Sequence, residues 1–411
     1  MDNSYKSIAV LSCRSCGYKK FDDILSLGVQ YLSDFSSSEK KPEKYPLDLI
    51  LCSKCNLLQL KHTAPKASLY TERYGYRSGT NNTMKNELKS IVKKSIEKVG
   101  KKKKGFTVVD IGANDGTLLS NYSEKIFRVG IEPIKKFAKE CRRHADIVIN
   151  DFFNYKSFAE TIDNRKGHII TAISCFYDID NPNQFLSDVK RILDKNGLFV
   201  VQQNYLAGML QQNAFDNIVH EHLEYYSLLS LEHLFNKHDL EVFDVELSDI
   251  NGGSFRTFIA HKGRMQIHKN VLKLREQEKK LKLNRPKIYK DFASRVKETR
   301  EGLYNLLVKL KNKGKSVYLY GASTRGNTLL QFCNLDNILI SAAVERNSEK
   351  WGKTIASVGI PIISEKQARK EKPDYMLVLP WFFKEEFLER EKNYLKKSGH
   401  FIFPLPKIEI I

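Results

Sequence analysis

The stretch "TVVDIGANDGT", residues 107–117, constrains the fold of this chain more than any other feature. A β-branched run leads into a turn between two glycines, and a helix is expected from Thr117. The alternation continues downstream in the segments "FRVGIEP", "ADIVIND", "HIITAISC", "NPNQFLSDVKRIL" and "LFVVQQNY". Alternating strands and helices predict an α/β fold with a doubly wound parallel sheet, and a ligand at the carboxyl ends of its strands.

Acidic residues stand at three successive strand ends. Asp110 sits just before the turn, Glu132 ends the second strand, and Asp151 follows the third strand with Phe152 beside it. Glycines let the backbone approach a ligand, and an acid at the second strand end accepts both hydroxyls of a ribose. The third glycine of the dinucleotide pattern is missing, and Asp110 suits an amino-acid ammonium. The pattern favours S-adenosylmethionine (SAM) over NAD and over a purely structural turn.

The SAM contacts that we predict come from the turn and from the three strand ends. Asp151 would accept the adenine amine, and Phe152 would offer an apolar face to the ring. The full predicted set is Asp110, Gly112, Asn114, Asp115, Gly116, Glu132, Asp151 and Phe152.

Four of the seven cysteines form two C-x-x-C pairs, Cys13 with Cys16 and Cys52 with Cys55. Each pair fits a knuckle turn, and two knuckles supply the four thiolates of a structural Zn²⁺ site. Four protein ligands close the coordination shell, so this zinc is not expected to be catalytic. Free thiols and a redox pair are the alternatives. The remaining cysteines are expected to be buried small apolar groups.

A second unit of strand, glycine turn and helix, "KSVYLYGASTRGNTLLQF", lies at residues 315–332. Charged helices with apolar residues at helical spacing precede it, and its next strand, "LISAAVER", contains Glu345. We predict a second Rossmann-like domain in which backbone N–H groups from Ser323 to Asn327, together with Arg325, bind a pyrophosphate. The alternative is a ligand-free domain that only supports the first.

Length and charge narrow the classes of protein. A chain of 411 residues is expected to form two or three domains. The net charge of +20 suggests either anionic partners or a solvated surface. Aromatic residues are not interleaved with the lysines as in single-strand binders, so no nucleic acid partner is expected. Neither an N-terminal apolar run nor a bilayer-length apolar stretch occurs, so we expect a cytoplasmic protein without membrane insertion.

Taken together, the motifs resemble the sugar C-methyltransferases that act on nucleotide-linked deoxy-keto-sugars. The resemblance spans nearly the whole chain, through the blocks "CRSCG…LCSKCNLLQL", "YGYRSGTNNTM", "DIGANDGTLL", "FYDIDNP", "HEHLEYYS", "NGGSFR", "YGASTRGNTLL", "VERNSEKWGK" and "DYMLVLPW". It implies a small zinc-binding domain (1–80), a Rossmann-like class I methyltransferase domain (81–262), a helical bridge (263–313) and a second Rossmann-like domain that binds the nucleotide-sugar (314–411).

The resemblance also implies roles for single residues. The family's base lies in a Glu-His pair, which falls on Glu221 and His222. Tyr74 and Tyr76 are expected to cover the active site, and the turn at 321–327 to lie near the nucleotide-sugar.

The chain departs from the family at three places. Val219 stands where some members have a tyrosine, and Phe176-Tyr177-Asp178 stands where a histidine is frequent. Glu345-Arg346-Asn347 replaces the common Asp-Arg-Asn. The first two departures leave open whether a carbon or an oxygen is methylated.

The segment "HEHLEYYS", residues 220–227, is interpreted as the site of the general base. A metal site and a polar helix face are the alternatives, although the two histidines are not one helical turn apart as in the zinc proteases. A sugar carbon becomes nucleophilic only when a proton next to a ketone is removed. His222 is the predicted base, and Glu221 would orient it. Hydroxyl donors to the enolate oxygen are expected among Tyr177, Tyr205 and Tyr225.

Further substrate contacts are expected where polar residues follow strands. Gln202, Asn204 and Tyr205 leave such an end, and Arg256 in "NGGSFR" would pair with a phosphate unless the segment is a plain turn. The full predicted substrate set is Tyr74, Tyr76, Gln202, Asn204, Tyr205, Arg256, Ser323, Arg325, Asn327 and Glu345.

The sequence therefore predicts a SAM-dependent methyltransferase that acts on a carbon of a nucleotide-linked deoxy-keto-sugar, for polysaccharide, glycolipid or secondary-metabolite synthesis. A sugar O-methyltransferase is the first alternative. A zinc-containing RNA methyltransferase, suggested by the charge and the knuckles, and a SAM-sensing scaffold are the others. A monomer is favoured.

Overall fold

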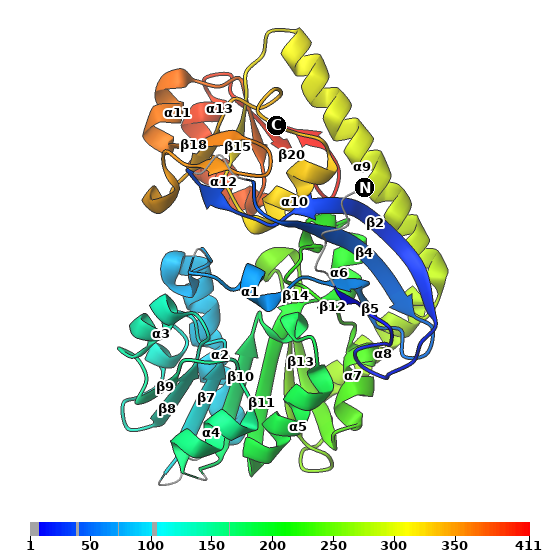
Figure 1. Ribbon diagram of the computed structural model, residues 1–411, viewed down its shortest axis with the longest axis vertical. Helices are drawn as coiled ribbons and strands as arrows, with labels where there is room; N and C mark the ends of the chain where they lie inside the picture. Colours follow the sequence, from blue (N-terminus) through cyan, green and yellow to red (C-terminus); the bar gives the residue numbers. More distant parts are fainter. Residues whose placement is uncertain (1–7, 38–40, 73, 101–104, 164) are drawn as a thin grey trace.

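The computed structural model describes residues 8–37, 41–72, 74–100, 105–163 and 165–411. Figure 1 shows a lower α/β body, in cyan and green, and an upper α/β body, in orange and red. The blue N-terminal strands β2 and β4 run between the two bodies, and the long yellow helix α9 follows one side. The N-terminal part of the chain is therefore placed to contact both α/β bodies.

The lower body is built on a seven-stranded sheet in the order β13-β14-β11-β10-β7-β8-β9. Its strands are β7 (Thr107–Ile111), β8 (Phe127–Ile131), β9 (Ile147–Ile149), β10 (Gly167–Ile173), β11 (Leu193–Asn204), β13 (Leu240–Ser248) and β14 (Ser254–His261). The first five are parallel, and β14 is antiparallel to both of its neighbours. The strand order reverses beside β7, which opens a crevice at the carboxyl ends of the strands. The predicted doubly wound sheet is confirmed.

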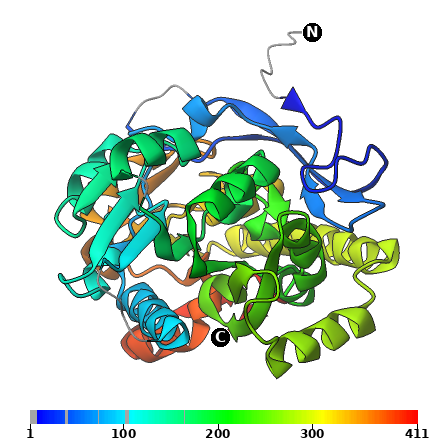
Figure 2. The same ribbon diagram turned by 90° about the horizontal axis from the view of Figure 1, so that it is seen from below.

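Helices cover both faces of this sheet (Figure 2). Val108 of β7 packs in one cluster with helix α2 (Asn82–Val99), and its neighbour Val109 belongs to the cluster that contains α4 (Tyr155–Ile162) and α5 (Pro182–Ile192). Successive strand residues point to opposite faces, so an unbroken apolar strand requires helices on both sides. The other helices of this body are α3 (Lys135–Cys141), α6 (Leu206–Gln211) and α7 (Leu228–Asn236).

The glycine turn after β7 forms as predicted, with φ of +73° at Gly112 and +81° at Gly116. The helix expected from Thr117 was wrong, because only a short 3₁₀ helix, η2 (Leu119–Asn121), follows. Side chains bind the local backbone instead. Asp115 Oδ1 accepts the N–H of Thr117 at 3.1 Å, and the Ser120 hydroxyl and Asn121 amide both donate to the Thr117 carbonyl at 2.8 Å. Such bonds compete with helical hydrogen bonds.

The N-terminal strands form a four-stranded sheet in the order β12-β5-β4-β2. It contains β2 (Phe21–Tyr31), β4 (Lys44–Cys52), β5 (Leu58–Leu60) and, from far along the chain, β12 (Glu224–Tyr225). Shorter elements here are β1 (Ile8–Ala9), which pairs with β6 (His62–Thr63), and helix α1 (Lys66–Leu69). Since β12 belongs to "HEHLEYYS", that segment is a turn followed by a strand and not the face of a helix.

The upper body contains an eight-stranded sheet in the order β21-β20-β19-β15-β16-β18-β17-β3. Its strands are β3 (Phe35–Ser36), β15 (Val317–Tyr320), β16 (Ala343–Glu345), β17 (Thr354–Ile355), β18 (Ile360–Ser364), β19 (Tyr375–Val378), β20 (His400–Phe403) and β21 (Glu409–Ile410). Its helices are α10 (Thr324–Phe332), α11 (Glu365–Glu371), α12 (Lys384–Arg390) and α13 (Lys392–Leu395). The second unit of strand, glycine turn and helix is thus β15 and α10, and the predicted second Rossmann-like fold is confirmed.

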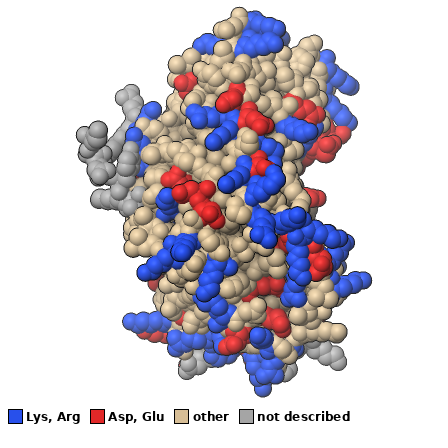
Figure 3. Space-filling model, turned by 90° about the vertical axis from the view of Figure 1, so that its right-hand side faces the viewer, with Lys and Arg blue, Asp and Glu red and all other residues tan. Residues whose placement is uncertain are grey.

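Two helices connect the bodies, α8 (Lys269–Leu281) and α9 (Pro286–Asn312). The buried residues of α9 recur every three or four positions, as at Tyr289, Phe292 and Val296, which gives the helix one apolar stripe. None of the described helices has the length and hydropathy that crossing a membrane requires. On the face that Figure 3 shows, basic side chains are scattered among acidic and uncharged ones and form no single patch.

Candidate active site

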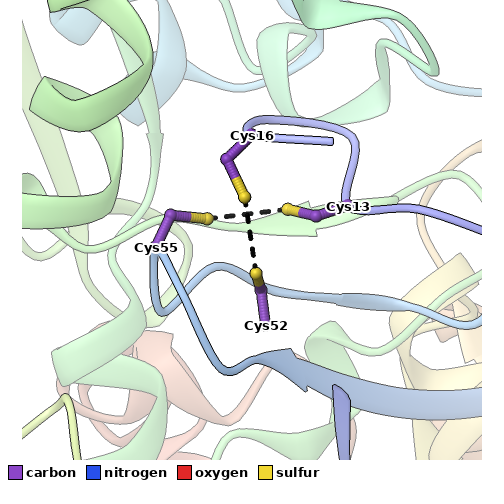
Figure 4. Close-up of side chains that lie close together, drawn as sticks. All are labelled: Cys13, Cys16, Cys52 and Cys55. Atoms are coloured by element: carbon purple, nitrogen blue, oxygen red, sulfur yellow. Dashed lines mark hydrogen bonds between the residues drawn. The ribbon is translucent and has the colours of Figure 1, made fainter. Parts of the chain in front are cut away.

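The four cysteines of the two C-x-x-C pairs converge in space (Figure 4). Their sulfur atoms all lie within 4.8 Å of one another, with Cys13 and Cys55 3.5 Å apart and Cys16 and Cys52 3.6 Å apart. Zn–S bonds of about 2.3 Å in a tetrahedron imply sulfur separations of about 3.8 Å, so the four thiols fit one zinc ion. The Gln59 amide also donates to Cys13 Sγ at 3.3 Å, as is suitable for a thiolate.

The first knuckle is attached to the lower α/β body. Arg14 donates to the Leu60 carbonyl and to the Thr63 hydroxyl, both at 2.7 Å, and lies 3.3 Å from Asp180. Asn183 donates to the Arg14 carbonyl at 2.6 Å. The contacts of this knuckle therefore hold the N-terminal sheet, which includes strand β12, against the lower α/β body.

A cavity of about 310 Å³ opens at the carboxyl ends of β7, β8 and β9. Six of the predicted cofactor residues line it: Asp110, Gly112, Asn114, Glu132, Asp151 and Phe152. These supply three carboxylates for an ammonium group and hydroxyls, and an aromatic ring for a flat base. The donor set fits SAM.

Two of these carboxyl groups are held inside the protein. Glu132 accepts the N–H groups of Asn114 and Ile134, both at 2.8 Å, and Asp110 accepts the Thr171 hydroxyl at 2.6 Å. Burial raises the pKa of Asp110 to about 7 and also raises the pKa of Glu132. Burying a carboxylate without a cation is unfavourable, so a ligand that brings an ammonium and hydroxyl donors would relieve that cost.

Asp115 and Gly116 lie outside this cavity and support it. Asp115 Oδ2 accepts the N–H of Gly79 at 2.8 Å, and Asn114 Nδ2 donates to the Tyr76 carbonyl at 3.1 Å. A Cβ atom on Gly116 would lie 3.0 Å from Cys141 Cα. These residues hold the turn against the segment that carries Tyr76.

A second cavity, of about 640 Å³, lies between the N-terminal part and the two α/β bodies. Tyr74 and Tyr76 line both cavities, so they form a shared wall. Glu221, Ser323 and Glu345 line the second cavity only. Two basic residues that no sequence motif pointed to, Arg77 and Lys350, belong to the same lining.

The predicted base occupies a defined position. The Nδ1 atom of His222 lies 2.8 Å from the Asn217 carbonyl. A carbonyl can only accept, so Nδ1 carries the proton and Nε2 is left as the acceptor. Burial, together with the charge of Arg325, lowers the pKa of His222 to about 3, so the imidazole is neutral near pH 7. The ring of Tyr177 meets His222 edge-on at 4.4 Å, and Tyr225 is buried, with its hydroxyl 3.5 Å from the same carbonyl.

The other histidine of the motif has a different partner. His220 Nε2 lies 3.0 Å from the Tyr45 carbonyl in the N-terminal sheet, and burial lowers the pKa of His220 to about 4. The two rings bind different carbonyls and do not converge as metal ligands. Within the described ranges, the only group of three or more potential ligands that could hold a metal is the cysteine cluster.

Several residues predicted to contact the substrate instead form hydrogen bonds or ion pairs with other protein groups. Arg256 is 3% exposed, and its guanidinium contacts Glu87 at 2.8 Å, Glu246 at 3.2 Å and Gln202 at 2.8 Å. These partners occupy the groups that a phosphate would need, so the prediction of a phosphate contact at Arg256 is corrected to an internal ion pair. Gln202 is one of those partners, and it too lies at neither cavity.

Polar partners also account for four other predicted contacts. The Tyr205 hydroxyl donates to Glu278 at 2.9 Å, and Asn204 donates to Asn217 at 3.0 Å. Asn327 accepts the Ser357 hydroxyl. Arg325 pairs with Asp216 of the lower α/β body at 2.8 Å and does not line the second cavity.

Asp178 is the residue that the sequence analysis most clearly missed. It lines the first cavity, its Oδ1 atom is buried, and that atom has no hydrogen-bond partner among the described residues. Burial and then the charge of Glu221 raise the pKa of Asp178 well above its usual range, while a hydrogen bond from Tyr70 opposes the shift. Its position just after β10, at the ligand edge of the sheet, was the signal available in the sequence.

Comparisons with known proteins cover nearly the whole chain. Residues 13–70 match the family described as a zinc binding domain, residues 82–245 the one described as a methyltransferase domain, and residues 249–406 the one described as a C-methyltransferase C-terminal domain. The chain is 30% identical to the C-methyltransferase NovU of Streptomyces niveus, over 97% of this chain and 96% of that one.

Solved structures give weaker likenesses. An S-adenosylmethionine-dependent methyltransferase from Clostridium acetobutylicum is 12% identical with a TM-score of 0.35, covering 45% of this chain and 94% of its own. The CcbJ methyltransferase from Streptomyces caelestis is 11% identical with a TM-score of 0.35, covering 46% and 94%. The fold assignment rests on the strand order and on the family matches.

Proposed function

The chain belongs to the SAM-dependent C-methyltransferase family with an N-terminal zinc-binding domain, and from that premise we propose that it methylates a carbon of a nucleotide-linked deoxy-keto-sugar with His222 as the general base. The four cysteines would bind its structural zinc, and the first cavity would hold SAM. We also propose the four domains at 1–80, 81–262, 263–313 and 314–411.

One observation carries the assignment of the base. The Asn217 carbonyl fixes the proton of His222 on Nδ1, which leaves Nε2 as a proton acceptor on a ring that packs edge-on against Tyr177. A neutral imidazole of this tautomer is ready to take a proton from the carbon beside a ketone. Glu221 faces the second cavity and would orient the sugar or the base.

The bound SAM supplies a methyl group that is already activated on a positively charged sulfur. The protein's part is to remove the sugar's proton, to steady the enolate oxygen and to keep water away. Tyr177 and Tyr225 supply hydroxyl groups near His222, and burial raises the pKa of both, so they stay protonated donors. Tyr74 and Tyr76 would close the space between the cavities.

The second cavity is the proposed site of the nucleotide-sugar. It combines a helix N-terminus at Ser323 and the carboxylate of Glu345 with two basic side chains, Arg77, which pairs with Glu140, and Lys350, which donates to the Ala322 carbonyl at 2.7 Å. Backbone N–H groups and cations favour a diphosphate, and a carboxylate suits ribose hydroxyls.

The experiment uses His222→Gln with a panel of nucleoside-diphosphate-linked 4-keto-deoxy-sugars. Loss of a general base is expected to lower turnover by roughly 10²- to 10⁴-fold. The variant should also lose exchange of the sugar's acidic C–H with deuterium from solvent, while SAM affinity remains. His220→Gln is the matched control, because that ring contacts the N-terminal sheet.

Near-wild-type turnover of His222→Gln would disprove the base assignment. NMR of the product decides the atom that is methylated, since a methyl on carbon and a methyl on oxygen have separate shifts. An O-methyl product would replace the proposed reaction with its alternative.

A further inference from the structure

A buried ion pair joins the C-terminal body to the segment just before the base. Arg325 lies in the first turn of α10, and Asp216 lies in the short 3₁₀ helix η4 (Phe215–Asn217) of the methyltransferase body. Arg325 Nε and Nη2 lie 3.1 and 2.8 Å from Asp216 Oδ2, and Asp216 is 1% exposed.

The pair is reinforced by the loop that follows β19. The indole N–H of Trp381 donates to the same Asp216 oxygen at 3.0 Å, and the Phe382 ring lies 4.7 Å from the Arg325 guanidinium. Trp381 also packs on Gly252, where a Cβ atom would lie 3.2 Å from the indole. Helix α10 and the segment after β19 in one body therefore both bind one carboxylate of the other body.

The carboxylate is next in sequence to the carbonyl that orients His222. The Asn217 carbonyl accepts the Nδ1–H of His222 at 2.8 Å, and the Asn217 side-chain oxygen accepts the Asn204 amide at 3.0 Å. A three-residue 3₁₀ turn has poor hydrogen-bond geometry of its own and needs outside contacts to stay in one place. The contacts of Asp216 supply them.

We propose that Asp216 and Arg325 are positioning residues for the general base: the ion pair between the two bodies holds the Asn217 carbonyl where it fixes the tautomer of His222. This rests on the proposed function of His222. Contact of the C-terminal body with Asp216 thereby fixes the tautomer of His222. Arg325 acts through Asp216 and not as a phosphate ligand.

Two physical arguments favour positioning over simple attachment of the bodies. A buried ion pair adds little net stability compared with apolar residues of similar size, so its presence suggests a need for a defined geometry. Burial is the main cause of the lowered pKa of His222, and the positive charge of Arg325 lowers that pKa further. Both effects act on the same ring.

The test reads the tautomer directly and needs no sugar substrate. Protein labelled with ¹⁵N-histidine is examined by NMR, and His222→Gln identifies the His222 signals. The wild type should show the proton on Nδ1. Arg325→Met and Asp216→Ala should lose this single tautomer and show a mixture, while Arg325→Lys, which keeps the charge, should retain part of it.

Calorimetry with S-adenosylhomocysteine and with UDP, dTDP and GDP accompanies the NMR. The affinities of Arg325→Met should stay within roughly three-fold of the wild type. Arg275→Met is the matched control, because Arg275 pairs with Glu232 at 2.7 Å between α8 and α7, away from the base, and should leave the His222 signals unchanged.

An unchanged His222 tautomer in both Arg325→Met and Asp216→Ala overturns the proposal. A large loss of diphosphate affinity in Arg325→Met, with the tautomer intact, also overturns it and makes Arg325 a phosphate ligand. If a variant does not fold, Trp381→Phe removes one donor to Asp216 and should cause a smaller change of the same kind. Because the NMR reports position and not turnover, it stays informative even if His222 proves not to be the base.

Discussion

The two units of strand and glycine turn in this chain differ at the residue two positions before the first glycine. The first unit has Asp110 and the second has Leu319, and both side chains are almost fully buried. The units share one feature, because Glu132 just after β8 and Glu345 at the end of β16 each accept a backbone N–H of the glycine turn, that of Asn114 or Ala322.

The glycine turn therefore determines the shape of each site, and single residues such as Asp110 or Leu319 determine which ligand groups it favours. Burying the Asp110 carboxylate is unfavourable unless a cation binds beside it, whereas the apolar side chain of Leu319 needs no polar partner. In the second turn the cationic side chain, Arg325, pairs with Asp216 instead of facing the cavity. We therefore expect the first unit to select a ligand with an ammonium group and the second to select one by its diphosphate.

The largest expected effect follows from Asp110→Asn, which makes the first unit resemble the second. Removing the carboxylate leaves a partly buried ammonium unpaired, so we expect SAM affinity to fall by about 3 kcal/mol, roughly 100-fold. Calorimetry measures the change. Leu319→Met should leave SAM binding unaffected, and equal binding by Asp110→Asn would show that the acid does not hold the ammonium.

The same variant has a pH signature in the ligand-free protein. The pKa of Asp110 rises from 3.8 in the unfolded chain to about 7 in the fold, so its ionisation lowers stability as pH increases between these values. Asp110→Asn should therefore raise the melting temperature more at pH 8 than at pH 5. An increase that does not depend on pH would contradict a buried, titrating Asp110.

A crossed pair of variants should separate the two units. Glu132→Gln weakens hydrogen bonds to ribose hydroxyls. We expect SAM binding to lose about 2 kcal/mol, which raises the Kd roughly 30-fold. Glu345→Gln should leave SAM binding intact and weaken the binding of a nucleoside diphosphate. If both variants weakened only SAM binding, the second unit would have no ligand role.

Much of the fold was predictable because its signals are local. The β-branched run at 107–111, the glycines with positive φ and the acids at strand ends are all read within a few residues, and the fold class they predicted is confirmed. The C-x-x-C spacing of the four cysteines likewise predicted that their sulfur atoms lie close together, as they do.

What could not be predicted depends on partners that are distant in sequence. Arg256 and Arg325 were expected to bind phosphate, yet each lies beside an acid, Glu87 or Asp216, more than 100 positions away. The pairing of β12 with β5 of the N-terminal sheet is equally distant. The helix expected from Thr117 failed for a local reason, competition from polar side chains, which propensity alone does not capture.

The smallest effect concerns the adenine end of the first cavity. Phe152 is 41% exposed, and its ring meets Tyr70 edge-on at 5.8 Å, so one face is available for a flat base. Phe152→Leu keeps the apolar bulk and loses the stacking, for which we expect about 1 kcal/mol, roughly five-fold in Kd for S-adenosylhomocysteine. Trp351→Leu is the control, because this exposed indole beside Glu345 belongs to the second unit. Equal losses in the two variants would mean that neither ring contacts the cofactor, and a selective loss at Phe152 would place the adenine in the first unit.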